Sequence, residues 1–168
     1  MTVLDEVAAL DLLVFAIDDR RYGLPASEVV ELTRAVAIYS RPETEPSHLL
    51  EGVVNLHGQL AAAINLRSRF GHPAKRLSPS EHFIFTRAAG HLLALRADHI
   101  VEIIRAPQES LDKIPRPTKD NSSEYLAGVC KQSDNLIFIF DLQKFLSASD
   151  SRAIENLLNA ALDEDSPL

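Results

Sequence analysis

Seven side chains in this sequence could support metal or nucleophilic chemistry: six histidines and one cysteine. A zinc site needs several such ligands at short, regular spacings, such as two histidines four positions apart on a helix or a Cys-x-x-Cys pair. No two histidines have that spacing on an expected helix, and Cys130 is the lone cysteine. The sequence therefore predicts no metal site.

Nucleophilic catalysis would have to use Cys130, with His57 as its base. Cys130 lies in an apolar stretch, where a cysteine usually acts as a small hydrophobic residue, and no activating signature surrounds it. Gly-x-Ser-x-Gly, Walker and Gly-x-Gly-x-x-Gly motifs are absent as well. We therefore expect no catalytic residues and no cofactor, and we keep a Cys130–His57 enzyme as an alternative.

One segment differs from its own repeat later in the chain. This segment is Gly52-Val53-Val54-Asn55-Leu56-His57-Gly58, and its counterpart is residues 128–134. Residues 128–134 keep the Gly-Val strand but lose Asn-Leu-His-Gly. One interpretation is that Asn55 and Gly58 supply turn conformations with positive φ. The other is that this edge contacts a partner, since a purely structural turn would not have to differ between the two places.

That counterpart belongs to an internal repeat. Leu24–Leu32 recurs 71 positions later as Leu95–Ile103, and Leu60–Leu66 recurs 76 positions later as Leu136–Leu142. Each copy is too small to bury much core alone, which suggests that the two copies cooperate. A groove between two such units is a natural binding site.

Short apolar runs in each copy predict about five strands, which hide their edges most readily by curling into a barrel. Proline-rich linkers at 34–49 and 106–125 separate the strands of each copy. A last apolar stripe predicts a helix over about 150–162, with Ser149, Asp150 and Ser151 as N-cap candidates. This helix could pack on its own barrel or be offered to a partner.

Composition narrows the classes of partner. The 168 residues carry a formal net charge of −7, and no basic stripe could neutralise phosphates, so we expect no nucleic-acid partner. No apolar run is long enough to span a membrane, and the first residues lack the basic region of a secretory signal, so we expect no direct membrane insertion. With the lone cysteine, these features predict a cytoplasmic location.

Several motifs, in collinear order, resemble the CheW family of chemotaxis coupling proteins over about residues 12 to 146. The family's opening strand matches Leu12-Leu13-Val14-Phe15, and its Tyr-Gly-Ile element matches Tyr22-Gly23-Leu24. Its Val-x-Glu-Ile element matches Val29–Leu32, and its Gly-Val-x-Asn-Leu-Arg-Gly matches Gly52–Gly58. In the second half, Tyr125–Val129 also fits.

The resemblance implies an all-β fold with short helices: two five-stranded SH3-like barrels side by side, followed by a C-terminal helix. Residues 1–168 would form a single CheW-like domain. Its first subdomain would span about 12–72 and its second about 80–146.

The resemblance also implies a non-catalytic adaptor. Its partners would be the helical signalling tip of a chemoreceptor, docked between the barrels, and the regulatory domain of a CheA-type histidine kinase. The implied partner-binding residues are Val29, Glu31, Leu32, Asn55, His57, Gly58 and Ile100. We expect Glu31 and His57 to lie close together on one exposed face, and partner binding to depend on an apolar ridge around Val29 and Leu32. The alternative for Val29 and Ile100 is that both belong to the barrel core. We place the adaptor in a chemosensory array, which could be specialised, for instance for type IV pili. The alternative is a structural ring component that binds kinase-like partners without a receptor.

Two of the four departures from the family pattern lie in or next to the Gly52–Gly58 segment; the other two are Ala62, where the family usually has proline, and Asn65, where it usually has aspartate. His57 replaces an arginine that pairs in the family with the glutamate matched by Glu31, and histidine is shorter and only partly charged near neutral pH. Glu51 stands where close relatives often have lysine. The barrel should tolerate all of these changes, whereas the receptor interface could change.

Overall fold

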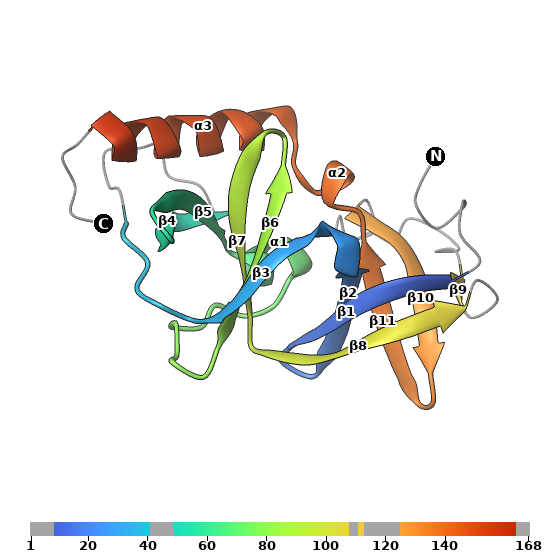
Figure 1. Cartoon of the computed structure of the whole chain (residues 1–168). Coiled ribbons are helices and arrows are strands. Elements are labelled where there is room, and N and C mark those ends of the chain that lie inside the picture. The colour runs from blue at the N-terminus through green and yellow to red at the C-terminus, as the bar shows by residue number, and fades with distance from the viewer. Residues whose placement is uncertain (1–8, 41–48, 108–110, 113–124, 164–168) are drawn as a thin grey trace. The chain divides into compact units, whose positions relative to one another are not determined.

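The computed structural model describes residues 9–40, 49–107, 111–112 and 125–163. These residues form two β-sheets, three α-helices and a short 3₁₀ turn, Ala26–Glu28 (Figure 1). The strands are β1 (Ala9–Ile17), β2 (Arg20–Pro25), β3 (Val29–Arg34), β4 (Leu50–Leu56), β5 (Gln59–Ile64), β6 (His82–Ala88), β7 (His91–Ala97), β8 (His99–Pro107), β9 (Leu111–Asp112), β10 (Leu126–Gln132) and β11 (Asn135–Phe140). The helices are α1 (Leu66–Phe70), α2 (Leu142–Phe145) and α3 (Ala148–Asp163).

Each sheet is the centre of one compact unit. Unit 1 comprises Met1–Glu28 and Asp98–Phe145, and its strand order is β8-β1-β2-β11-β10-β9. Unit 2 comprises Val29–Ala97 and Leu146–Leu168, and its strand order is β3-β6-β7-β5-β4. The prediction of an all-β fold with a C-terminal helix is confirmed. One sheet has a sixth strand, the two-residue β9, beyond the five predicted.

The strand register repeats the two sequence offsets. Leu13 pairs with Leu24 in unit 1, and Ile84 pairs with Leu95, 71 positions on, in unit 2. In the same way the β4–β5 register recurs in β10–β11 at an offset of 76, including a bulge just before Gly52 and Gly128. The two copies predicted from the sequence are therefore two equivalent sets of strands.

The predicted subdomain boundaries, 12–72 and 80–146, are wrong because the copies exchange their first hairpins. The β1–β2 hairpin of the first copy pairs with β8 and β11 of the second. The β6–β7 hairpin of the second copy pairs with β3 and β5 of the first. An internal repeat shows which strands are equivalent. It does not show which partners each hairpin takes, because the strands of both copies could pair with it in the same register.

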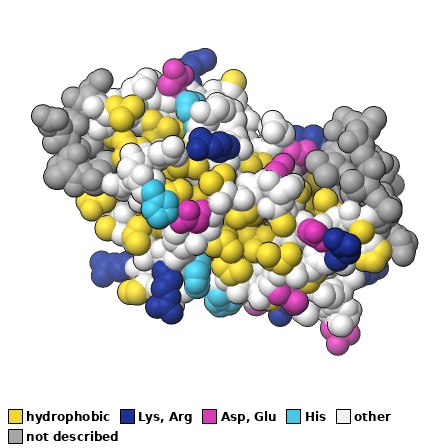
Figure 2. Space-filling model, in the orientation of Figure 1, with side chains coloured by type: hydrophobic (Ala, Val, Ile, Leu, Met, Phe, Trp, Pro, Cys, Tyr) yellow, Lys and Arg dark blue, Asp and Glu magenta, His cyan; other side chains and the backbone are white. Residues whose placement is uncertain are grey.

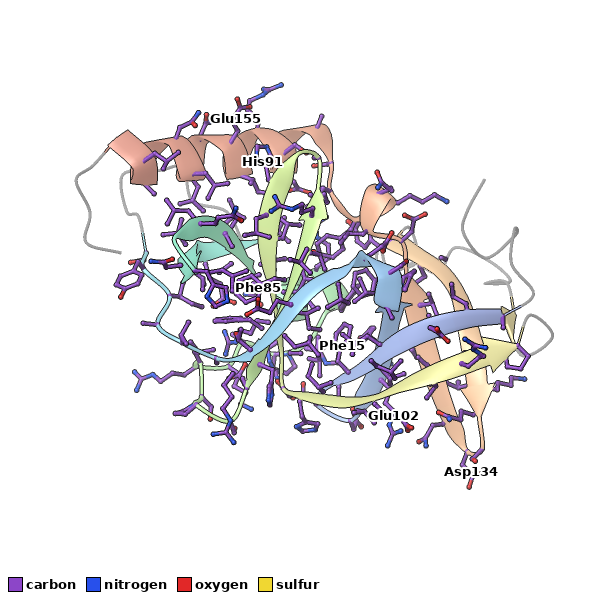
Figure 3. The ribbon with its side chains drawn as sticks, viewed as in Figure 1. Phe15, Phe85, His91, Glu102, Asp134 and Glu155 are labelled. Carbon is purple, nitrogen blue, oxygen red and sulfur yellow. The ribbon has the colours of Figure 1, made fainter. Side chains whose placement is uncertain are left out.

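Aromatic and aliphatic side chains form the core of each unit. Phe15 is fully buried in unit 1 and stacks on Tyr22, with ring centroids 5.9 Å apart. Phe85 is buried in unit 2 and meets Phe83 edge-on (Figure 3). Each unit also has a compact apolar cluster. The buried members in unit 1 are Leu10, Leu12, Val14, Ala106, Cys130, Ile137 and Ile139, and those in unit 2 are Val54, Leu56, Ala61, Ala63, Phe83, Phe85, Leu92 and Ala94.

Helix α3 packs on β4 and β5 of unit 2 and buries Ile154, Leu157 and Ala161. The predicted helix over 150–162 is thus confirmed, and packing on its own unit accounts for this buried face. Glu155 lies on the opposite face, which points away from the strands (Figure 3). Among the described residues, no helix is long and apolar enough to cross a membrane.

The helix begins earlier than predicted, since its N-cap is Ser147 rather than Ser149, Asp150 or Ser151. Ser147 Oγ accepts a hydrogen bond from the Asp150 backbone N–H at 3.1 Å, and an Asp150 carboxylate oxygen accepts one from the Ser147 N–H at 2.9 Å. This reciprocal pair is a capping box, which satisfies two backbone donors at the start of a helix.

Candidate functional site

A two-residue turn joins β4 to β5 and presents His57 and Gly58 at its tip. Both residues have positive φ, 51° and 88° respectively, as a type I′ hairpin turn requires. Glycine adopts such values freely, and histidine is among the side chains found there more often than most. Gly58 therefore supplies a turn conformation, as predicted. Asn55 does not: it stays in β4, and its side-chain oxygen accepts a hydrogen bond from the Gly58 N–H at 2.8 Å.

The turn directs His57 toward β3, where it meets Glu31. His57 Nε2 lies 2.9 Å from Glu31 Oε2, so the prediction that these two side chains lie close together is confirmed. The pair is well exposed, with side-chain exposures of 75% for His57 and 37% for Glu31. An exposed polar contact of this kind contributes at most about 1 kcal/mol to folding, so its polar atoms remain available to a partner.

Strand β3 also exposes apolar side chains. Leu32 is 39% exposed and Val30 is 50% exposed, whereas Val29 is half-buried. Val36 and Tyr39, in the segment that follows β3, are exposed as well. Figure 2 shows hydrophobic side chains reaching the viewed surface between charged groups.

Val30 was missed by the sequence reasoning, because a bulge interrupts the alternation of side chains in β3. In a regular strand, residues two apart share a face and residues three apart do not. In β3 the register shifts between Val29 and Glu31, so Val29 pairs with Thr86 and Leu32 pairs with Ile84, two positions apart on β6. Val29 and Leu32 therefore share a face, but Val29 is half-buried. The exposed apolar side chains of β3 are Val30 and Leu32, which we call the β3 ridge.

Six of the seven predicted partner-binding residues belong to unit 2, and the seventh, Ile100, belongs to β8 of unit 1. Ile100 occupies the repeat position of Val29, and both are half-buried. Three positions further along β8, Ile103 is 63% exposed and occupies the repeat position of Leu32. The two equivalent strands therefore each expose one large aliphatic side chain at the same place.

Cys130 has surroundings that do not suit a nucleophile. Its side chain is buried in the apolar cluster of unit 1, which includes Leu12, Val14 and Ile137. A reactive thiol needs partial exposure and nearby positive charge, neither of which an apolar cluster supplies. His57, the base of the alternative enzyme, lies in unit 2 and contacts Glu31. Among the described residues, no group of three His, Cys, Asp or Glu side chains could hold a metal ion.

Comparison with known proteins agrees with this architecture. The sequence model of the CheW-like domain matches residues 11–150. Chemotaxis protein CheW of Helicobacter pylori is 29% identical over 142 residues, which cover 84% of each chain. Protein FrzA of Myxococcus xanthus is 26% identical over 147 residues, covering 86% of this chain and 89% of FrzA.

The crystal structure of the scaffolding protein TtCheW from Thermoanaerobacter tengcongensis superposes with a TM-score of 0.74 at 27% identity. The match covers 84% of this chain and 94% of TtCheW, so it includes both units. The family match spans most of the sequence, and the structural match extends it to the fold. The chain therefore belongs to the CheW-like domain family.

Proposed function

We propose that this chain is a non-catalytic chemotaxis adaptor that couples chemoreceptors to a CheA-type histidine kinase in a chemosensory array. The observation that carries the proposal is the family match over residues 11–150. The burial of Cys130 in an apolar cluster supports a binding role over the alternative enzyme. The similarity to FrzA supports a specialised pathway as the setting.

The proposed partner surface combines the β3 ridge with the neighbouring turn. A helical receptor tip would bind through buried apolar anchors, and the exposed Leu32 and Val30 have the right character for that role. Glu31, Asn55, His57 and Gly58 would add polar contacts around the ridge. The half-buried Val29 and Ile100 would contribute mainly by supporting their strands.

A reconstitution experiment tests the proposal. The intact chain is mixed with the receptor and the CheA-type kinase from the same genome, and kinase autophosphorylation is measured with each component omitted in turn. We expect the chain to change kinase activity only when the receptor is present. Leu32→Asp should abolish that change. Leu136→Asp is the matched control, because Leu136 is also an exposed leucine, at 47%, but lies on β11 of unit 1.

The second candidate, a ring component that binds the kinase without a receptor, is favoured by one departure. His57 replaces the arginine of the family motif, and it is paired with Glu31 only through an exposed contact. For this candidate, the chain should co-purify with the kinase regulatory domain, and adding the receptor to the autophosphorylation experiment should make no difference to its effect. An effect of the chain that requires the receptor would exclude it.

A further inference from the structure

Unit 2 contains a group of charges, which we call the Arg96 cluster: the buried Arg96 of β7, the buried Glu81 just before β6, and the half-buried Glu51 of β4. Arg96 Nε donates to Glu81 Oε1 at 2.6 Å, and Arg96 Nη1 donates to Glu51 Oε2 at 2.9 Å. Arg96 Nη2 donates to the Lys75 carbonyl oxygen at 2.6 Å. Only 6% of the Arg96 side chain and 1% of the Glu81 side chain are exposed.

The charges of the cluster depend on one another. Burial alone would lower the pKa of Arg96, but the hydrogen bond to Glu81 and the negative charges of Glu51 and Glu81 outweigh burial and raise it. Arg96 therefore stays charged. Removing Arg96 would leave the buried Glu81 carboxylate without its positive partner, which is far more costly than replacing the whole group by apolar side chains.

The cluster holds the ends of the two strands that carry the proposed partner surface. The Glu81 carbonyl oxygen accepts a hydrogen bond at 2.9 Å from the N–H of Ala35, which directly follows β3. Glu51 is the second residue of β4, the strand that leads to His57. Between these points, Tyr39 and Val53 exchange backbone hydrogen bonds of 2.9 Å and join the segment after β3 to β4.

The Glu31–His57 pair cannot fix this arrangement by itself. Both side chains are exposed, so water and salt screen their attraction, and the contact costs side-chain entropy to hold. A buried bidentate arginine is a much stiffer link, because its planar donors accept only a narrow range of carboxylate positions. The spacing between Glu31 and His57 must therefore be set by buried contacts rather than by their own hydrogen bond.

The fold itself does not require these charges. The repeat positions of Glu81, Arg96 and Glu51 in unit 1 are Leu10, Pro25 and Ala127, at offsets of 71, 71 and 76. Leu10 is buried in the apolar cluster of unit 1, and Ala127 packs against it. Since an apolar solution closes the equivalent place in unit 1, the charges of unit 2 must serve something beyond closing a barrel.

We propose that Arg96 is a positioning residue: with Glu81 and Glu51, it fixes β3 against β4 and thereby sets the spacing of the Glu31–His57 surface. This inference rests on the proposed function for its biological meaning. Its structural half, that the cluster fixes β3 against β4, does not depend on the proposed function, because it can be measured without any partner. Glu51, where close relatives often have lysine, thus gains a specific partner in Arg96.

The test replaces the cluster by side chains like those of unit 1, in the full-length variant Glu51→Ala/Glu81→Leu/Arg96→Leu. Arg96→Leu alone could fail to fold because it strands two carboxylates, so the triple variant is the decisive one. Amide hydrogen exchange is measured at Tyr39 and Val53, whose N–H groups report the link between β3 and β4. Affinity for the receptor and the kinase regulatory domain is measured in parallel.

We expect the triple variant to melt cooperatively, while protection of the Tyr39 and Val53 amides falls by about tenfold or more. Partner binding should weaken by about tenfold. The control is Arg105→Leu, which removes an exposed arginine paired with Asp11 at 3.0 Å in unit 1 and should change neither readout.

Three results would overturn the inference. Unchanged protection at Tyr39 and Val53 would show that the cluster does not position these strands. Loss of the cooperative melt would show that it is needed for folding itself. Reduced protection with unchanged partner binding would show that β3–β4 spacing does not matter to the partner. If the wild-type chain binds neither partner, the proposed function fails instead, and the exchange data still decide the structural half.

Discussion

The two units have the same strand register but differ in how they close one end. In unit 2, Arg96 joins Glu81 and Glu51 through buried hydrogen bonds. In unit 1, the repeat positions hold Leu10, Pro25 and Ala127, and the region is apolar. Two solutions in one chain show that the barrel tolerates either. Because a buried ion group adds little net stability over an apolar one, the difference teaches that charge here specifies geometry.

The hairpin turns differ in a similar way. The turn between β10 and β11 has Ser133 at φ 54°, where unit 2 has His57 at φ 51°, so the backbone is conserved between the units while the side chain is not. Asp134 lies at the tip of the unit 1 hairpin (Figure 3). Among the residues that the structure describes, the turn residue reaches a carboxylate of a neighbouring strand only in unit 2, where His57 meets Glu31. The differences between the units therefore gather around β3 and β4.

Cutting the chain between residues 75 and 76 should have the largest effect, because it separates every exchanged hairpin from its partners. Fragment 1–75 contains β1–β5 and fragment 76–168 contains β6–β11, so neither contains a complete sheet. We expect neither fragment to melt cooperatively. An equimolar mixture should recover the β-sheet circular dichroism and the cooperative melt of the intact chain, measured under the same conditions.

A sharp melt from either fragment alone would contradict the exchange of hairpins, since it would mean that one sequence copy can close a barrel by itself. Recovery on mixing distinguishes exchange from simple damage at the cut. Fragments that merely lost a few contacts would remain partly folded alone and would gain little from each other.

Substitutions at two glycines of unit 2 should separate strain from crowding. Gly52 has φ 146°, and a Cβ there would collide with the Tyr39 carbonyl oxygen and with Ile38. Gly58 has φ 88°, and a Cβ there would meet open space. We expect Gly52→Ala to cost about 3 kcal/mol and Gly58→Ala about 1 kcal/mol, measured by urea unfolding. Equal losses would show that the close approach of Tyr39 to β4 is not rigid.

Much of the fold could be predicted from the sequence, because apolar runs and repeated motifs constrain local structure. The offsets of 71 and 76 reappear as strand registers, and the C-terminal stripe is helix α3. The exchange of hairpins could not be predicted, since β1 finds equivalent pairing positions on β3 and on β8. Only the packing of the whole chain decides between them.

The candidate site was partly predictable for a different reason. The Glu31–His57 contact followed from the resemblance, but the Arg96 cluster did not, because its members are separated by 15 and 45 positions and no motif joins them. The repeat did contain a signal. The residues at 51, 81 and 96 are charged, whereas the residues at their repeat positions in the other copy are apolar. Three such differences together indicate that the charged residues form one buried group.

Two carboxylates should make the units respond to acid in opposite ways. In unit 1, burial and then the charge of Asp141 raise the pKa of Glu28, and its Oε2 is buried without a hydrogen-bond partner among the described residues. In unit 2, burial opposes ionisation of Asp150, but hydrogen bonds from Ser147 and Arg69 outweigh it and lower the pKa. Arg69 Nη2 lies 2.8 Å from the Asp150 carboxylate.

The signs follow from proton linkage. The Glu28 carboxylate is destabilising at neutral pH, and this penalty is relieved as pH falls through its raised pKa toward the ordinary value. The contribution of Asp150 is complete above the ordinary aspartate pKa and is lost as pH falls through its lowered pKa. At pH 7, Glu28→Gln should stabilise the chain and Asp150→Asn should destabilise it, each by on the order of 1 kcal/mol.

Thermal melts at pH 7 and pH 4 measure both effects. The gain from Glu28→Gln should shrink at pH 4, because the raised pKa lets the native glutamate take up its proton there. The loss from Asp150→Asn should shrink less, because the lowered pKa of Asp150 keeps more than half of this carboxylate ionised at pH 4. A gain from Glu28→Gln that stays constant with pH would mean that the amide acts through packing rather than by removing a buried charge.

The smallest effect on stability should come from the exposed pair itself. His57→Ser gives the unit 2 turn the residue that unit 1 has at Ser133, and so removes the contact with Glu31 while keeping a turn that unit 1 already tolerates. A double-mutant cycle with Glu31→Gln should give a coupling energy of about 0.5 kcal/mol, which should fall further in high salt. The same variants should weaken partner binding more than they weaken folding, because a partner would desolvate the pair.

A coupling above about 2 kcal/mol would place the pair among the buried, structural contacts. The division between a buried cluster that positions β3 and β4 and an exposed pair that meets the partner would then be wrong, and unit 2 would differ from unit 1 in its stability rather than in its surface.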